Sequence, residues 1–138
     1  RLDNALSATQ AAVETGILPG GGIALLRARP TVEALLGDLV EDEKLGAEVL
    51  ARALSSPLEQ IASNAGIEGK VVVNRVLKKD EFSYGYDALQ EDYCDLIKAG
   101  VIDPTKVTSS ALVNAASVSS LLLTTSCAIA EEVEEEED

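Results

Sequence analysis

The chain has 138 residues, which suits one domain of ordinary size or a piece of a larger protein, and its net charge is −13. Seven acids lie in the last eight residues; the rest has 17 acidic against 11 basic residues, a charge of −6 that argues against nucleic-acid and anionic-membrane partners. No histidine is present, which excludes a Ser-His-Asp triad and histidine-containing zinc sites. We find no apolar run long enough to span a bilayer and no signal-peptide layout, so no membrane partner is expected.

An all-α, mainly helical fold is expected, because aromatic residues make up only 3% of the chain and the core must come from Ala, Val, Leu and Ile. Apolar residues at helical spacing predict a first helix from Asp3 to about Thr15. Asp3 or Asn4 is available as its N-cap, and Gly16 ends it. Because methionine is absent, we expect the chain to be part of a longer polypeptide.

Three successive glycines at 20–22 follow a proline and precede the apolar run Ile23–Leu26. This pattern predicts a glycine turn that forms the N-terminal entry of a second helix. Pro30 punctuates that helix, and a helical pattern resumes over Thr31–Leu39 before it fades in the polar stretch Glu41–Lys44.

Two further helices are predicted at Lys44–Leu54 and Pro57–Asn64, with Pro57 in a first turn and Gly66 as a C-terminal cap. The segment Glu68–Leu77 contains three successive valines, whose periodicity fits a strand or a helix. We favour a helix there.

The sequence FSYGYDAL at 82–89 predicts a turn with short extended arms, because Gly85 breaks a helix and tyrosines favour strands. The pattern of Gln90–Lys98 is typical of a short amphipathic helix, which ends at Gly100. The sequence VIDPTKV at 101–107 is expected to be a loop that leads into the next helix.

The longest predicted helix runs from Thr105 to about Thr125, and its many small residues favour close packing on neighbouring helices. The sequence SCAIA at 126–130 predicts a short strand, and the glutamate-rich 131–138 a disordered acidic tail. Such a tail could bind divalent cations weakly, but a run of like charges is usually solvated, and we predict no metal site. Cys94 and Cys127 form no CxxC pair, so we expect two reduced, partly buried thiols.

Two features could contact a ligand. The glycine turn precedes a helix N-terminus, where free N–H groups attract anions and a flat ligand can approach the backbone, although a tight loop between helices explains it equally well. Asp87 and Asp103 lie on expected loops, where they could accept hydrogen bonds from ribose hydroxyls or an exocyclic amine, or simply form turns and caps. Serine, threonine and lysine have no paired base, so covalent catalysis has no candidate.

Four motifs that follow one another along the chain indicate a family more specifically than their local physical properties do. They are RLDNALSATQAAVETGILPGGGIALL, PLEQIASNAG, YGYDAL and AGVIDPTKVTSSALVNAASVSSLLLTT. Together they resemble the C-terminal part of a group I chaperonin, the bacterial and organellar type, from Arg1 to about Ala130. The resemblance implies that 1–10 ends the intermediate, or hinge, domain, and that 11–130 forms the C-terminal half of the helical equatorial ATP-binding domain. The apical substrate-binding domain and the phosphate-binding loops of the family lie outside this chain.

The resemblance also implies site residues on the adenine and ribose side of a pocket for ATP or ADP with Mg²⁺. Gly21 would contact the nucleotide through its backbone, and Asp103 would bind the ribose. Asp87, Ala88 and Leu89 would face the adenine. Asp87 stands where the family usually has asparagine, and Leu89 replaces a small residue, which puts a side-chain hydrogen bond from position 87 in doubt.

The first five residues depart from the family in a further way. The family pattern Arg-Val-Glu-Asp-Ala is here Arg1-Leu2-Asp3-Asn4-Ala5, so the carboxylate expected to position magnesium and the attacking water is the amide of Asn4. An amide accepts no proton and binds hard cations weakly. We therefore hypothesise that a subunit with Asn4 binds nucleotide but hydrolyses it slowly.

By this resemblance, the chain is part of an ATP-dependent chaperonin that assists protein folding in a ring. The implied partners are other subunits in a double ring, a co-chaperonin lid, and unfolded clients bound by the apical domain. The Glu-rich end favours the chloroplast stroma, with the mitochondrial matrix and bacterial cytoplasm as alternatives. An alternative function is a non-catalytic helical assembly module whose acidic tail recruits a partner. We also expect the isolated piece to expose apolar helix faces.

Overall fold

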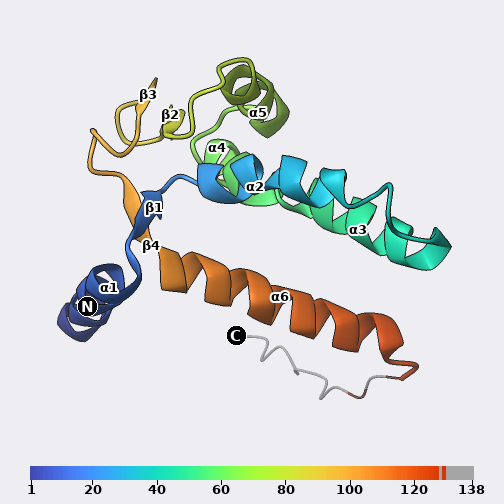
Figure 1. The fold of residues 1–138 in the computed structure, drawn as a ribbon. Coiled ribbons are helices and arrows are strands. Elements are labelled where there is room, and N and C mark those ends of the chain that lie inside the picture. The colour runs from blue at the N-terminus through green and yellow to red at the C-terminus, as the bar shows by residue number, and fades with distance from the viewer. Residues whose placement is uncertain (128, 130–138) are drawn as a thin grey trace, which may run out of the picture. The chain divides into compact units, whose positions relative to one another are not determined.

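The computed structural model describes residues 1–127 and 129, of which 60% lie in helices and 11% in strands, so the mainly helical prediction is confirmed (Figure 1). The chain forms two compact units, Arg1–Thr108 and Ser109–Asp138. The first unit holds every element before α6 together with the first turn of that helix.

Helix α1 spans Leu2–Thr15 and ends before Gly16, whose φ of 82° suits glycine. The predicted side-chain N-cap is wrong, because the helix begins one residue earlier, with Arg1 at the N-cap position and no side-chain capping bond. The chain then enters strand β1, Ile17–Pro19, which we did not predict.

Helix α2 spans Ile23–Ala34, directly after the glycine turn as predicted, but it continues through Pro30 rather than being interrupted there. The buried side chains of Ile23 and Leu26 hold its first turns in the core, and only one further turn follows the proline. Packing therefore outweighs the loss of one backbone hydrogen bond.

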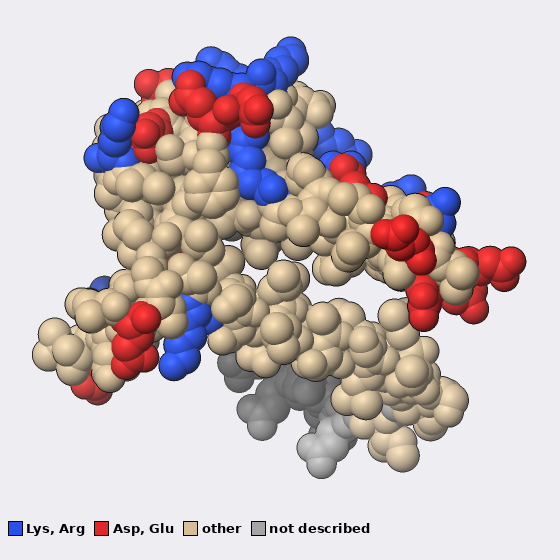
Figure 2. Space-filling view, viewed as in Figure 1, with Lys and Arg blue, Asp and Glu red and all other residues tan. Residues whose placement is uncertain are grey.

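Helices α3 (Glu41–Ala53), α4 (Ser56–Asn64) and α5 (Gly69–Leu77) confirm the three predicted helices. Helix α3 begins three residues earlier than expected because its first turn is acidic and complements the helix dipole; acidic side chains gather at that end in Figure 2. Gly66, with φ of 79°, follows α4 as the predicted cap.

Strands β2 (Tyr84–Asp87) and β3 (Asp92–Asp95) form an antiparallel hairpin. The helix predicted at Gln90–Lys98 is therefore wrong. The hairpin is favoured over a helix because Tyr93 pairs with Tyr86, with their ring centroids 5.1 Å apart. Tyr93 also stacks on Tyr84 of β2, with a distance of 6.2 Å between the ring centroids. These contacts join separate segments, so helical spacing within one segment does not reveal them.

Strand β4 (Ile102–Pro104) replaces the predicted loop and pairs antiparallel with β1, so that Leu18 lies opposite Asp103 (Figure 1). Thr105 then begins α6, and its N–H donates to the Gly16 carbonyl at 3.0 Å. The buried core of this unit is made of α2, α4, α5 and the hairpin, namely Ile23, Leu26, Leu58, Ala62, Val72, Val73, Val76, Tyr86 and Leu96.

Helix α6 spans Thr105–Thr124, which confirms the longest predicted helix. By length and composition alone it could cross a membrane, contrary to our reading of the sequence; this is weak evidence, and none of that window is buried. Figure 2 shows little charge on its visible face, and its large apolar side chains other than Leu112 are exposed, as expected for a piece of a larger fold. Helix α6 buries no residue, and the close helix packing expected from its small residues stays a prediction.

The strand predicted at 126–130 lies partly outside the described residues, and its described residues Ser126, Cys127 and Ile129 are not in a strand. The predicted acidic tail at 131–138 lies wholly outside the described residues. Both cysteines are free. Cys94 is partly buried as expected, whereas Cys127 is exposed, which corrects that prediction.

The two thiols should therefore react at different rates. Burial, followed by the nearby carboxylates of Asp87, Asp92 and Asp95, raises the pKa of the Cys94 thiol, so less of the reactive thiolate forms there. We expect Cys127 to be alkylated roughly tenfold faster than Cys94 at mildly alkaline pH, measured by peptide mass spectrometry. Adding denaturant should remove the difference; equal rates in the folded protein would contradict it.

Candidate functional site

The glycine turn is fixed by backbone contacts on two sides. The Gly20 N–H donates to the Val101 carbonyl at 2.8 Å, which ties the turn to the residue before β4. A Cβ on Gly22 would lie 2.7 Å from the backbone nitrogen of Leu58 at the start of α4, and the φ of Gly22 is 76°. Both the tight approach and the left-handed backbone therefore require glycine at position 22.

Gly21 lies against the hairpin. A Cβ placed there would be 3.0 Å from Leu96 Cδ1 and 3.4 Å from the Tyr86 carbonyl oxygen, and its φ is 66°. Gly85 of β2 packs as closely, since its Cβ would lie 2.8 Å from Ile23 Cγ2. The predicted PGGG and YGYD motifs, more than sixty residues apart in sequence, thus meet through their glycines.

Asp87 is buried, with 7% of its surface exposed, and its carboxylate accepts hydrogen bonds from the backbone of its own loop. Its Oδ1 accepts hydrogen bonds from the Leu89 N–H at 2.9 Å and the Gln90 N–H at 3.2 Å. This turn shapes the hairpin tip, where Ala88 packs against the core and Leu89 is 87% exposed. The turn-forming alternative for Asp87 therefore holds in this structure.

Alanine at position 87 should consequently destabilise the fold, whereas asparagine should not. Asp87→Ala leaves two amides without their acceptor, and we expect the free energy of unfolding to fall by about 1–3 kcal/mol. Asp87→Asn keeps an Oδ1 acceptor and should stay within about 0.5 kcal/mol of the original. Denaturant unfolding of both variants measures this; equal losses would show that the turn bonds contribute little.

The remaining predicted site residues lie in two places. Asp103 is exposed on β4, which pairs with the strand leading into the glycine turn, so the structure brings Asp103 to the same end of the unit as Gly21. Asn4 is exposed in the first turn of α1, about 16 Å along the helix from its end at Thr15. Asn4 is therefore not brought together with the other candidates.

Val101 lies beside the glycine turn and the hairpin, although we did not single it out from the sequence. Its carbonyl accepts from Gly20, its own N–H donates to the Leu96 carbonyl at 2.8 Å, and its side chain packs against the core. It therefore links the glycine turn, the end of the hairpin and β4. The sequence signal for it was its place two residues before Asp103 in GVIDP.

Asp95, the last residue of β3, holds the turn that follows the hairpin with its ionised carboxylate. Its Oδ1 accepts from the backbone N–H groups of Ile97 at 3.1 Å and Lys98 at 3.2 Å. The hydrogen bond from the Lys98 N–H, with help from the Ser83 hydroxyl and the Lys98 charge, lowers the pKa of Asp95 below its ordinary 3.8. The folded state therefore favours ionised Asp95.

This pKa sets the direction of a pH effect. Because the folded pKa lies below the unfolded value, Asp95 stabilises the fold above pH 3.8, and this stabilisation is lost as the pH falls through the folded pKa. The difference in unfolding free energy between the original protein and Asp95→Ala should be largest near neutrality and shrink in acid. Denaturant unfolding across this pH range tests it; a difference that grows in acid would contradict it.

Comparisons with known proteins identify the family and the fold. The family model of the TCP-1/cpn60 chaperonin family matches residues 1–132, so the chain belongs to that family. Among solved structures, a group III chaperonin in the open state has a TM-score of 0.77 and 32% identity, covering 86% of this chain and 25% of that chain. The fold matches the chaperonin equatorial domain.

An open-state monomer of a group II chaperonin from Methanococcoides burtonii has a TM-score of 0.72 and 20% identity, covering 79% of this chain and 28% of that chain, and supports the fold alone. This chain therefore spans about a quarter of the length of these solved chaperonins. Neither belongs to the group I type that the motifs resemble, so that finer assignment stays a prediction.

Proposed function

We propose that this chain is the C-terminal equatorial part of a group I chaperonin subunit, which uses ATP to assist protein folding in a ring. The observation that carries the proposal is the meeting of the PGGG turn, the YGYD hairpin and the IDP strand at one end of the first unit. Residues 1–10 would then end the intermediate domain and 11–130 would be equatorial.

The residues present fit the adenosine half of ATP. Gly21 offers backbone that a ligand can approach closely, Leu89 offers an exposed apolar side chain to a base, and Asp103 offers an exposed carboxylate to ribose hydroxyls. Asp87 would shape the base-facing loop through its turn bonds rather than contact the base directly. ATP, when bound with Mg²⁺, would supply the free energy of hydrolysis.

The phosphates and Mg²⁺ would be held mainly by residues outside this chain. Within the described residues, no group of three or more cysteine, aspartate or glutamate side chains is arranged to hold a metal ion. In this proposal the chain orients the nucleoside, and the complete subunit carries out any hydrolysis.

The exposed apolar side chains along α6 support assembly with further chaperonin sequence and with other subunits of a double ring. A co-chaperonin lid and unfolded clients would act through the apical domain of the complete subunit. The glutamate-rich end favours the chloroplast stroma as the location.

Nucleotide binding by the complete subunit tests the proposal. Asp103→Ala should weaken ATP binding by roughly tenfold, because it removes a charged hydrogen-bond acceptor for the ribose. Asp38→Ala removes the same charge from an exposed turn and is the matched control. A ring-sized native mass without ATP binding would favour the alternative, an assembly module; ATP binding unaffected by Asp103→Ala would refute the role of Asp103.

A further inference from the structure

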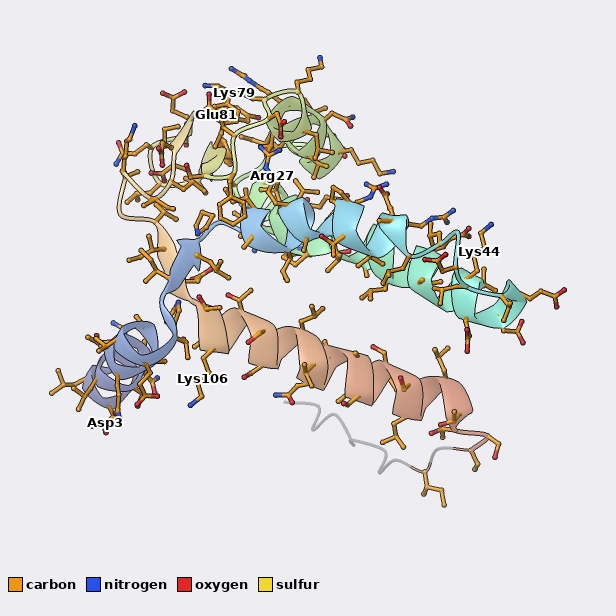
Figure 3. All side chains as sticks on the ribbon, viewed as in Figure 1. Asp3, Arg27, Lys44, Lys79, Glu81 and Lys106 are labelled. Atoms are coloured by element: carbon orange, nitrogen blue, oxygen red, sulfur yellow. The ribbon has the colours of Figure 1, made fainter. Side chains whose placement is uncertain are left out.

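Arg27 joins two segments that are far apart in sequence. It lies on α2, little more than one turn after the glycine turn, and its Nη2 donates to the Val76 carbonyl at 3.1 Å and to the Lys79 carbonyl at 2.7 Å. These carbonyls belong to the last turn of α5 and to the link that follows it. Figure 3 shows Arg27 reaching from α2 toward Lys79 and Glu81.

The hydrogen bonds continue from this carbonyl into the hairpin. The Lys79 carbonyl also accepts from the Glu81 N–H at 2.9 Å, and the Glu81 carbonyl accepts from the Tyr84 N–H at 3.2 Å. Tyr84 is the first residue of β2. The Lys79 ammonium lies 3.3 Å from Glu81 Oε1 and 4.5 Å from the Tyr84 ring centroid. A continuous set of contacts thus runs from Arg27 to the base-facing hairpin.

Hydrogen bonds rather than burial hold this link in place. Residues 77–82 are all exposed, and Phe82 is 54% exposed, so no apolar side chain between α5 and the hairpin anchors the segment. The guanidinium, by contrast, is partly enclosed, and its Nε is buried without a hydrogen-bond partner in the described part of the chain. Keeping a buried donor unpaired is unfavourable, so the two carbonyl bonds must offset that loss.

Arginine suits this position better than lysine. Its planar, multi-donor head holds two carbonyls in a fixed geometry, and its charge complements the negative end of the α5 dipole. Arg29, on the same helix, instead forms an exposed ion pair with Glu33 at 2.7 Å. Exposed pairs of this kind contribute little to stability.

We propose that Arg27 is a positioning residue for nucleotide binding, because it sets the hairpin that carries Asp87 and Leu89 relative to the glycine turn that carries Gly21. This inference rests on the proposed function. Its consequence is specific: loss of Arg27 should weaken recognition of the base while leaving the turnover of bound ATP unchanged.

The test uses the complete, assembled subunit and compares Arg27→Ala, Arg27→Lys and the matched control Arg29→Ala. ATP affinity is measured by equilibrium binding, base discrimination by competition with GTP, and turnover at saturating ATP. Arg27→Ala should lower ATP affinity roughly tenfold and narrow the preference for ATP over GTP, with turnover unchanged. Arg27→Lys should recover part of the affinity, and Arg29→Ala should match the original protein.

Unchanged ATP affinity and base preference in Arg27→Ala would overturn the inference. This holds even if the variant melts at a lower temperature, because that combination would show that Arg27 only stabilises the fold. If Arg27→Ala does not assemble, the ATP affinity of Arg27→Lys decides between the two roles. An ATP affinity equal to that of the original subunit overturns the inference, and a reduced ATP affinity with unchanged turnover supports it. Failure of the original subunit to bind ATP would instead refute the proposed function, and the inference with it.

Discussion

Replacing Gly22 by alanine is expected to destabilise the fold by about 3 kcal/mol or more and, under the proposed function, to abolish nucleotide binding with it. The added Cβ would lie 2.7 Å from the Leu58 nitrogen and 3.1 Å from the Pro57 carbonyl carbon, both backbone atoms that cannot rotate away. The left-handed φ of 76° adds a separate cost for any residue with a side chain. The glycine turn, α2 and α4 meet at this point, so a shift would displace Gly21 as well.

Two other glycines separate these causes. Gly66 has a similar φ of 79° but open space around its Cβ position, so Gly66→Ala measures the conformational cost alone, about 1 kcal/mol. Gly46 lies within α3 and is also open, so Gly46→Ala should stabilise the protein by about 1 kcal/mol. Denaturant unfolding of the three variants gives the ranking; a Gly22→Ala loss no larger than that of Gly66→Ala would show that the close approach is not limiting.

Under the proposed function, Asn4→Asp in the complete subunit is expected to raise the rate of ATP hydrolysis by roughly a hundredfold, because the family resemblance implies that a carboxylate at this position orients Mg²⁺ and the attacking water. Asn4 is exposed on α1 and forms none of the contacts that hold the glycine turn, so ATP affinity should change little. The steady-state rate at saturating ATP is the measurement.

The exchange Asp3→Asn with Asn4→Asp provides a control at constant charge. Adjacent helical residues point about 100° apart, so only the carboxylate at position 4 should be productive. We expect the exchanged variant to hydrolyse ATP as fast as Asn4→Asp. A rate that depends on the number of acids rather than on position 4, or no change in either variant, would refute the role of this residue.

The helices were predictable because their hydrogen bonds are local. The periodicity of α1, α4, α5 and α6 matched the structure to within a few residues, including the valine-rich α5 whose pattern was ambiguous. The strands were not predictable in the same way. Gln90–Lys98 has helical spacing, but Tyr93 gains more from its contacts with the tyrosines of β2 than from a short isolated helix.

For the candidate site, too, sequence motifs were predictable and contacts between segments were not. Motifs in the sequence pointed to Gly21, Asp87 and Asp103, and the structure joins their segments through glycine contacts and the pairing of β1 with β4. The role of Asp87 as a turn former required its geometry, since a loop carboxylate can equally face a ligand. Arg27 gave no signal in the sequence, because an arginine in an amphipathic helix is usually a solvated residue.

The sequence by itself determined the helices, the exclusion of histidine chemistry, and the chaperonin motifs, because each depends on residue identity and short-range spacing. Only the tertiary structure decided that two strand pairs exist, that the three motif segments meet, and that Arg27 holds the entry to the hairpin. The β2–β3 hairpin depends on tyrosine contacts between two neighbouring strands. The other features depend on contacts between segments dozens of residues apart, such as the bond from Arg27 to the Lys79 carbonyl 52 positions away. Such contacts form only when burial of the core brings those segments together.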